Sequence, residues 1–251
     1  MDKRTLHLWL ANPNDVLAEG IAEECDRLLT EDERARLQAF RFERLRHEYL
    51  TTRALVRTAL SHYHPISPES WRFTLNAYGK PTADADCAMQ FNLSNCPELV
   101  VCLISHGAEV GVDVEPWARA EEIAEVAHTV FSPLELEQLE TLSGPEKGDR
   151  GVSLWTLKEA YIKARGMGVS LPLKKISFVF GGAEGIHLEL DPCLNDESER
   201  WQFCQFDHAG HRIAMMVERT AGPKLEVLEM RPLLAEPTKL SDGVVRWYPY
   251  C

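Results

Sequence analysis

The stretch Val110-Gly111-Val112-Asp113-Val114-Glu115 alternates strictly between valine and a second residue. Successive side chains of a β-strand point to opposite faces, so the valines share one face and Asp113 and Glu115 share the other. Two residues along a strand span about 6.6 Å, where two carboxylates repel by on the order of 2.5 kcal/mol at an effective dielectric of about 20. Two interpretations follow: a polar sheet face in water, or a site for a hard divalent cation such as Mg²⁺.

A helix is predicted over residues 153–165, where Gly166 provides a typical end signal. Its expected buried stripe consists of Leu154, Leu157, Tyr161 and Ala164. Trp155, Glu159 and Lys163 recur every four residues and stack on a neighbouring face. Taken alone, Glu159 and Lys163 fit an ordinary surface salt bridge, which contributes roughly 0.3 to 0.5 kcal/mol.

The strand and the helix together predict a more specific arrangement than either predicts alone. Asp113, Glu115 and Glu159 would supply three oxygen ligands to one Mg²⁺, an ion that bridges protein carboxylates to substrate phosphates. Lys163, one helical turn beyond Glu159, would then stabilise charge that develops on phosphate oxygens. The outline is that of a site for phosphoryl transfer.

Outward from these two stretches, both halves of the chain run in the order strand, helices, strands, which predicts an α+β fold. Strands are expected over residues 5–10, 71–75, 91–95, 99–104, 110–115, 176–180 and 201–217. Helices are expected after the capping box at Thr30, over residues 43–62 and after Ser132, with a loop over 143–151. We expect an N-terminal subdomain over 1–106, a C-terminal subdomain with the metal site over 107–230, and a tail over 231–251.

Composition limits the classes of function. The chain has 251 residues, 45% of them apolar, and a formal net charge of −12, which disfavours binding to nucleic acid or to an anionic membrane. The absence of an apolar run of about 18 residues predicts a soluble, cytoplasmic protein. Its seven cysteines are scattered without a C-x-x-C pair, so we expect reduced thiols and no zinc site. His62 and His64 have no further ligands nearby in sequence and fit ordinary surface histidines.

Several motifs in order along about residues 30–175 closely resemble the signatures of Sfp-type 4′-phosphopantetheinyl transferases. They are Gly111-Val-Asp113-Val-Glu115, Phe131-Ser-x-x-Glu135 and Trp155-x-x-Lys158-Glu159-Ala-x-x-Lys163-x-x-Gly166-x-Gly168. Upstream, Tyr78-Gly79-Lys80-Pro81 and Phe91-Asn92-Leu93-Ser94 resemble that family's GKP and FN-x-S motifs.

The resemblance implies a pseudodimer of two similar α/β subdomains, with coenzyme A in the cleft between them. A serine of an apo acyl, peptidyl or aryl carrier protein would attack the β-phosphorus of coenzyme A and release 3′,5′-ADP. Mg²⁺ on Asp113, Glu115 and Glu159 would hold the diphosphate, while Lys163 and Lys158 offset negative charge. Glu159 would also accept the serine proton, directly or through a metal-bound water. Larger members of the family suggest a monomer.

The resemblance also implies residues that contact coenzyme A. Lys80 and Ser94 would contact the phosphates of the nucleotide. Where the family usually has histidine after FN-x-S, this chain has Asn95, which donates a hydrogen bond but carries no charge. Arg41 and Arg53 belong to a run of arginines that could compensate for this loss, although a solvated helix face explains each of them equally well.

Two alternative functions remain open at this point. One is a different magnesium-dependent phosphotransferase or phosphohydrolase with the same three carboxylates. The other is an inactive module that binds coenzyme A or docks a carrier protein, for which Asn95 is the only support. The carriers of fatty-acid, polyketide, siderophore and other nonribosomal pathways all remain candidate substrates.

Overall fold

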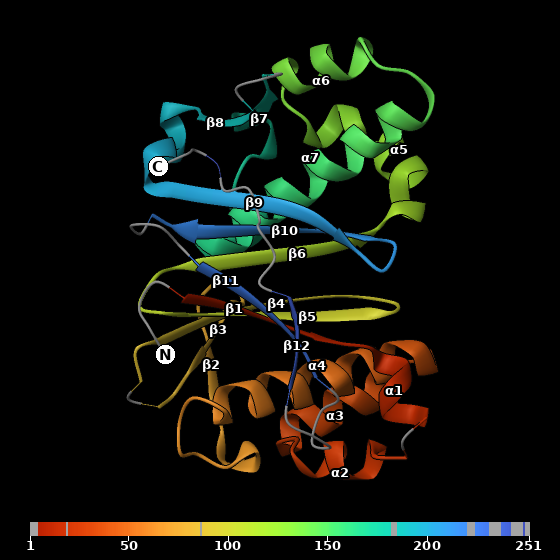
Figure 1. Cartoon of the computed structure of the whole chain (residues 1–251), viewed down its shortest axis with the longest axis vertical. Coiled ribbons are helices and arrows are strands. Elements are labelled where there is room, and N and C mark those ends of the chain that lie inside the picture. The colour runs from red at the N-terminus through yellow and green to blue at the C-terminus, as the bar shows by residue number, and fades with distance from the viewer. Residues whose placement is uncertain are drawn as a thin grey trace. The chain divides into compact units, whose positions relative to one another are not determined.

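The computed structural model describes residues 5–18, 20–85, 87–181, 185–219, 224–230, 237–241 and 248. The chain divides into two compact units (Figure 1). Unit 1 comprises residues 1–76, 81–107 and 223–243, and unit 2 comprises residues 77–80, 108–222 and 244–251. Each unit contains a sheet and helices, so the predicted α+β class is confirmed.

Unit 1 is built on a five-stranded sheet. Its strands, in spatial order, are β12 (Thr238–Ser241), β11 (Lys224–Glu229), β1 (Thr5–Ala11), β5 (Leu99–His106) and β4 (Met89–Cys96). Only β1 and β11 pair in parallel among these described strands. The strand predicted over residues 99–104 is present in β5, which is buried along nearly its whole length.

The helices of unit 1 gather around one long helix. That helix is α4 (Glu43–Ser61), and the shorter ones are α1 (Pro13–Ala18), α2 (Ala22–Arg27) and α3 (Glu31–Ala39). The predicted capping box is present at the start of α3, where the Thr30 side chain accepts from the Glu33 amide and the Glu33 carboxylate accepts from the Thr30 amide. A small hairpin of β2 (Phe73–Leu75) and β3 (Pro81–Ala83) completes the unit.

Unit 2 is built on a three-stranded antiparallel sheet. Its strands, in spatial order, are β6 (Val110–Pro116), β10 (His211–Glu218) and β9 (Trp201–His208). The tight turn between β9 and β10 uses positive φ at Ala209 and Gly210, as a two-residue hairpin requires. The long helix α7 (Gly144–Arg165) lies against β6 and β10 (Figure 1).

Two short helices and a hairpin surround α7. They are α5 (Ala120–Val130), α6 (Pro133–Glu140) and the pair β7 (Ile176–Phe180) and β8 (Ile186–Leu190). The helix predicted after Ser132 is α6, which begins with a capping box between Ser132 and Glu135 and has Pro133 in its first turn. The predicted apolar stripe of α7 is also confirmed, because Leu154, Leu157, Tyr161 and Ala164 are all buried in the core of the unit.

The predicted loop over residues 143–151 is wrong, because α7 begins at Gly144. Glycine and charge normally weaken a helix, but two of these glycines face α5 at close range. A side chain on Gly148 would crowd Ala120, and one on Gly151 would contact Ile123. The glycines therefore allow two helices to pack closely, which the local sequence alone does not reveal.

The chain returns to unit 1 near its C-terminal end. Residues 224–229, which we assigned to the subdomain 107–230, form β11, and β11 pairs with β1. That part of the predicted division is therefore wrong, because a long-range strand pairing returns this segment to unit 1. Of the expected tail over 231–251, the structure describes β12 and Tyr248, which bridges to Phe203, and the rest lies outside the described residues.

The two units repeat one order of elements. Each has a first strand, a short helix that begins with a capping box, a long helix, and then a hairpin whose second strand pairs antiparallel with the first strand. A small hairpin follows the long helix in both units. The predicted similarity of the two halves is thus present in topology, while the cleft between them stays a prediction.

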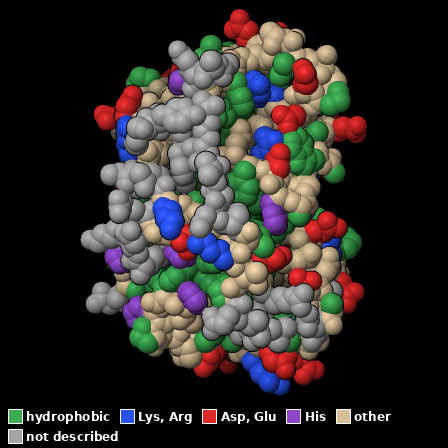
Figure 2. All heavy atoms as spheres, viewed as in Figure 1, with side chains coloured by type: hydrophobic (Ala, Val, Ile, Leu, Met, Phe, Trp, Pro, Cys, Tyr) green, Lys and Arg blue, Asp and Glu red, His purple; other side chains and the backbone are tan. Residues whose placement is uncertain are grey.

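The structure bears on the surface charge, on membrane spans and on the cysteines. On the face shown in Figure 2, the coloured Lys and Arg side chains stand singly or beside Asp and Glu. Within the described part of the chain, no helix combines the length and the apolar character that crossing a membrane requires. None of the six cysteines that the structure describes takes part in a disulfide there. The cytoplasmic location and the monomeric state stay predictions.

Candidate active site

Gly111 sets the distance between β6 and α7. A Cβ atom at this position would overlap the carbonyl oxygen of Ala160 and the amide nitrogen of Ala164. Only glycine therefore permits the backbone of the helix to approach the strand this closely. The next residues on the same face of β6 are Asp113 and Glu115, so the close approach brings their carboxylates to the polar face of α7.

The two carboxylates of β6 contact two residues of that helix face. Lys163 Nζ lies 2.6 Å from Asp113 Oδ1, and Trp155 Nε1 donates to Glu115 Oε1 at 3.0 Å. Both faces of β6 are buried, so the alternative of a polar sheet face in water is excluded. The predicted juxtaposition of strand and helix is therefore present in the structure.

Glu159 lies between Trp155 and Lys163 on the same face of α7. Its carboxylate is half-buried and has no hydrogen-bond or ion-pair partner among the residues that the structure describes. Burial raises the pKa of Glu159 above its ordinary value; the nearby charges of Asp113 and Glu115 raise it further, and Lys163 lowers it. Burial also raises the pKa of Glu115, and the charge of Asp113 raises it further, whereas the contacts with Arg119 and Trp155 lower it.

The donor chemistry of these three carboxylates fits Mg²⁺, a hard cation that prefers oxygen ligands. The three carboxylates repel one another, and that of Glu159 is half-buried without a partner among the described residues. A divalent cation would lower the electrostatic free energy of both arrangements. Across the residues described, however, no three His, Cys, Asp or Glu side chains are already gathered as a metal-binding group. Instead, Lys163 and Arg119 supply the cations that contact Asp113 and Glu115.

Lys158 lies apart from these groups in the structure, so the geometry does not favour its predicted catalytic role, which stays a prediction. Its side chain is 2% exposed and its Nζ lies 2.7 Å from Glu135 Oε2 in the core. It also donates to the carbonyl oxygens of Leu173, at 2.8 Å, and Ile176. All three ammonium hydrogens thus have protein acceptors, and Lys158 joins α7 to α6 and to the start of β7.

Lys80 is also held by protein atoms of its own unit. Its Nζ lies 2.8 Å from Glu109 Oε2, 2.9 Å from the Ala164 carbonyl oxygen and 3.3 Å from the Val110 carbonyl oxygen. The ammonium therefore has no hydrogen left for a phosphate in this structure. Lys80 ties the Gly-Lys-Pro turn to β6 and to the last turn of α7, and its predicted contact with coenzyme A is not what the geometry favours.

The remaining predicted contacts to coenzyme A lie in unit 1. Ser94 is buried in β4, while Asn95 is exposed and donates to Glu48 Oε2 at 3.3 Å. Arg41 is exposed before the start of α4. Arg53 lies 3.8 Å from a carboxylate oxygen of Glu33 and covers the ring of Tyr49. Their roles toward the nucleotide stay predictions.

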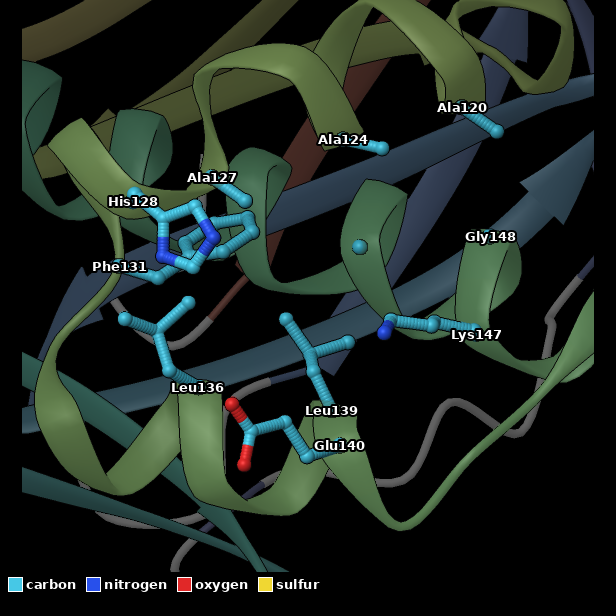
Figure 3. A pocket seen from close by; sticks show the side chains of 11 residues that line it. Ala120, Ala124, Ala127, His128, Phe131, Leu136, Leu139, Glu140, Lys147 and Gly148 are labelled. Carbon is cyan, nitrogen blue, oxygen red and sulfur yellow. The ribbon is translucent and has the colours of Figure 1, made fainter.

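A cavity of about 240 Å³ lies between α5, α6 and the first half of α7. Figure 3 shows three alanines of α5 on one side and Leu136 and Leu139 of α6 on the other. None of the predicted site residues lines it, and its mainly apolar wall offers little to a diphosphate. We assign this cavity no part in the chemistry.

Arg119 is the residue of this region that sequence reasoning missed. It donates to Glu115 from the 3₁₀ turn Trp117–Arg119, four residues further along the chain. Strand periodicity ends at Pro116 and helix periodicity begins at Ala120, so neither pattern covers Arg119. The only signal available in the sequence was an arginine at short spacing from a carboxylate.

Comparison with known proteins agrees with the geometry. A family model described as the 4′-phosphopantetheinyl transferase superfamily matches residues 109–216, which include both β6 and α7. The 4′-phosphopantetheinyl transferase HetI of Nostoc sp. is 30% identical over 193 residues, 74% of this chain and 79% of the relative. A phosphopantetheinyl transferase of Thraustochytrium sp. is 30% identical over 233 residues, 86% of this chain and 80% of the relative.

The 4′-phosphopantetheinyl transferase Sfp of Bacillus subtilis is 30% identical over 150 residues, 59% of this chain and 65% of the relative. The matches to the Nostoc and Thraustochytrium proteins extend over most of each relative's length. The chain therefore belongs to the Sfp-type 4′-phosphopantetheinyl transferase family, and it is an enzyme of that family.

Proposed function

We propose that this enzyme transfers 4′-phosphopantetheine from coenzyme A to a serine of an apo acyl, peptidyl or aryl carrier protein, with Mg²⁺ as its cofactor. The observation that carries the proposal is the facing of Asp113 and Glu115 on β6 by Glu159 and Lys163 on α7. Three acidic groups and one ammonium ion meet the needs of a reaction between phosphate groups, which are charge neutralisation and alignment.

Asp113, Glu115 and Glu159 are the residues that would hold Mg²⁺ in this proposal. When bound, the ion neutralises charge on the diphosphate of coenzyme A and helps to orient it. For the three carboxylates to act together, Lys163 must exchange its contact with Asp113 for one with a phosphate oxygen. Lys163 is suited to this exchange because its side chain is 26% exposed, whereas that of Lys158 is 2% exposed.

The transfer forms a bond between the carrier serine oxygen and the β-phosphorus, and it breaks the bond from that phosphorus to the bridging oxygen of the diphosphate. The leaving group is 3′,5′-ADP, whose developing negative charge Lys163 would offset. Glu159 accepts the serine proton in this scheme. Its raised pKa makes it a stronger base than an ordinary glutamate, and its carboxylate has no other partner among the described residues.

Binding of the nucleotide is assigned to residues of unit 1 in the same proposal. Ser94 and Asn95 follow one another on β4, and in this proposal they contact its phosphates together with the cations Arg41 and Arg53. Lys80 contributes indirectly, because it anchors the turn that precedes β3 to β6 and α7. The choice among acyl, peptidyl and aryl carrier proteins would depend on how well the surface of each carrier docks on the enzyme.

The test is incubation of the enzyme with coenzyme A, Mg²⁺ and an apo carrier protein, followed by mass spectrometry of the carrier. The expected result is the gain of one phosphopantetheine, lost on addition of a chelator and in Asp113→Ala. Asp191→Ala is the matched control, because Asp191 forms a similar ion pair with Lys175, at 2.7 Å, on the surface of the same unit. Unmodified carriers of all three classes would contradict the proposal, and release of phosphate without transfer would favour a phosphohydrolase.

A further inference from the structure

The carboxylate of Glu115 has a strongly asymmetric environment. Its Oε1 atom accepts two hydrogen bonds, one from Arg119 Nη1 and one from Trp155 Nε1 at 3.0 Å. Its other oxygen has no hydrogen-bond partner among the described residues. The two donors come from different elements, the 3₁₀ turn after β6 and the middle of α7, so they fix the carboxylate from two directions.

The guanidinium of Arg119 is itself held in place. Its Nε donates to Glu122 Oε2 at 3.0 Å, and its central carbon lies 5.5 Å from the ring centroid of Trp155. An arginine that is bonded at two nitrogens and stacked on an aromatic ring has little rotational freedom. Glu122 and Trp155 therefore hold Arg119 in place, and Arg119 and Trp155 both donate to one oxygen of Glu115. This holds although the Arg119 side chain is 34% exposed.

We propose that Arg119 is a positioning residue that orients Glu115 so that its second oxygen is available to the metal ion. The proposal rests on the metal site of the proposed function. Groups that hydrogen-bond to a metal ligand and fix its orientation typically contribute 10-fold to 100-fold to metal affinity. Arg119 would act in this way on a carboxylate of β6, while touching neither the metal nor the substrate.

The alternative is that Arg119 acts only through its charge. A cation beside a metal site repels the metal, so its removal would then tighten metal binding. Loss of a positioning contact has the opposite sign, because Glu115 would sample other rotamers and metal binding would weaken. The direction of the change in affinity therefore separates the two roles.

The experiment measures the affinity of the full chain for Mn²⁺ by electron paramagnetic resonance, in the absence of coenzyme A and carrier. Arg119→Met is expected to raise the Kd for Mn²⁺ by about tenfold. Arg119→Lys keeps the charge but loses the planar two-point contact, so its Kd should also rise, by a smaller factor. In a Glu115→Ala background the effect of Arg119→Met should disappear.

Arg200→Met is the matched control. Arg200 also bonds a glutamate, Glu218, through Nε at 3.1 Å and lies 4.7 Å above the ring of Trp201, but it is remote in sequence from β6. Its replacement should leave the Kd for Mn²⁺ unchanged. Thermal unfolding of each variant verifies that the fold is retained.

An unchanged or lower Kd in Arg119→Met would overturn the positioning role and leave the transferase assignment intact. Failure of the unsubstituted enzyme to bind Mn²⁺ would overturn the positioning role together with the metal site. Carrier modification, followed separately by mass spectrometry, would still report on transfer, so the two failures are distinguishable.

Discussion

Trp9 and Asp113 occupy the same place in the two units. Trp9 pairs with Cys102, the fourth residue of β5, and Asp113 pairs with Ala214, the fourth residue of β10. The ring of Trp9 lies 5.3 Å from that of His62, the residue directly after α4. Asp113 Oδ1 lies 2.6 Å from Nζ of Lys163, a residue of α7. One scaffold thus carries apolar packing in unit 1 and charged groups in unit 2.

A second correspondence lies at the start of the short helix in each unit. A glutamate of the capping box forms an ion pair with a buried cation of the long helix, 2.6 Å away in unit 1 and 2.7 Å away in unit 2. The residues are Thr30, Glu33 and Arg57 in unit 1, and Ser132, Glu135 and Lys158 in unit 2. Elements present in both units therefore serve the fold, and elements present in one unit are candidates for chemistry.

The largest expected effect tests the shared ion pair. Lys158→Met leaves Glu135 buried without its cation, and we expect it to lower the free energy of unfolding by about 3 to 5 kcal/mol, measured by urea denaturation. Arg57→Met should cost less, because the side chain of Glu33 is 16% exposed and that of Glu135 is fully buried. The double variant Lys158→Met/Glu135→Met should recover part of the loss. A negligible cost for Lys158→Met would contradict the structural role of the pair.

The next effect tests the residues that differ between the units. Asp113→Asn should lower the rate of carrier modification by about 10²-fold to 10³-fold, because a charge that neutralises the reacting groups is removed. Its thermal stability should not fall. Trp9→Phe is the reciprocal control: it loses the bond from Trp9 Nε1 to Tyr63 and should cost about 1 to 2 kcal/mol of stability with little effect on transfer. Equal effects of both variants on transfer would contradict the division of roles.

How much of this was predictable depends on whether the decisive contact is local. The alternation around Asp113 and the four-residue spacing of Glu159 and Lys163 are local patterns, and both gave correct geometry. The burial of Lys158 was not predicted, because it depends on Glu135, which lies 23 positions earlier on another helix. The start of α7 was missed because its glycines face a neighbouring helix, a contact that no local pattern encodes.

A smaller effect is expected from a substitution at Gly111 of β6, where there is no room for a side chain. Gly111→Ala forces α7 away from β6, so we expect a loss of about 1 to 3 kcal/mol in stability and about a tenfold fall in transfer rate. The matching residue of β1 is His7, which pairs with the sixth residue of β5 as Gly111 pairs with the sixth of β10. His7→Ala adds no clash and should leave transfer nearly unchanged. Full activity in Gly111→Ala would show that the close approach is dispensable.

The smallest effect concerns the repulsion among the carboxylates. In the folded protein the pKa of Glu159 is raised, so its ionisation destabilises the fold as pH rises through that value, and the penalty vanishes below the ordinary pKa of about 4.3. Glu159→Gln should therefore be more stable than the parent at pH 8, in chelator, by about 1 kcal/mol. Thermal unfolding measured down to pH 4 should show the advantage shrinking. A stability difference that does not change with pH would contradict this origin.

The return of the chain to β11 has a consequence for work with fragments. β1 lies between β11 and β5 in the sheet, and β11 follows β5 in the sequence by more than a hundred residues. A fragment that ends at Gly107 would expose the backbone N–H and C=O groups along β1 as a bare edge, ready to recruit a strand from another molecule. The N-terminal half should accordingly be prone to aggregation when expressed alone, and β1 would regain its second neighbour only if residues 223–243 were supplied in trans.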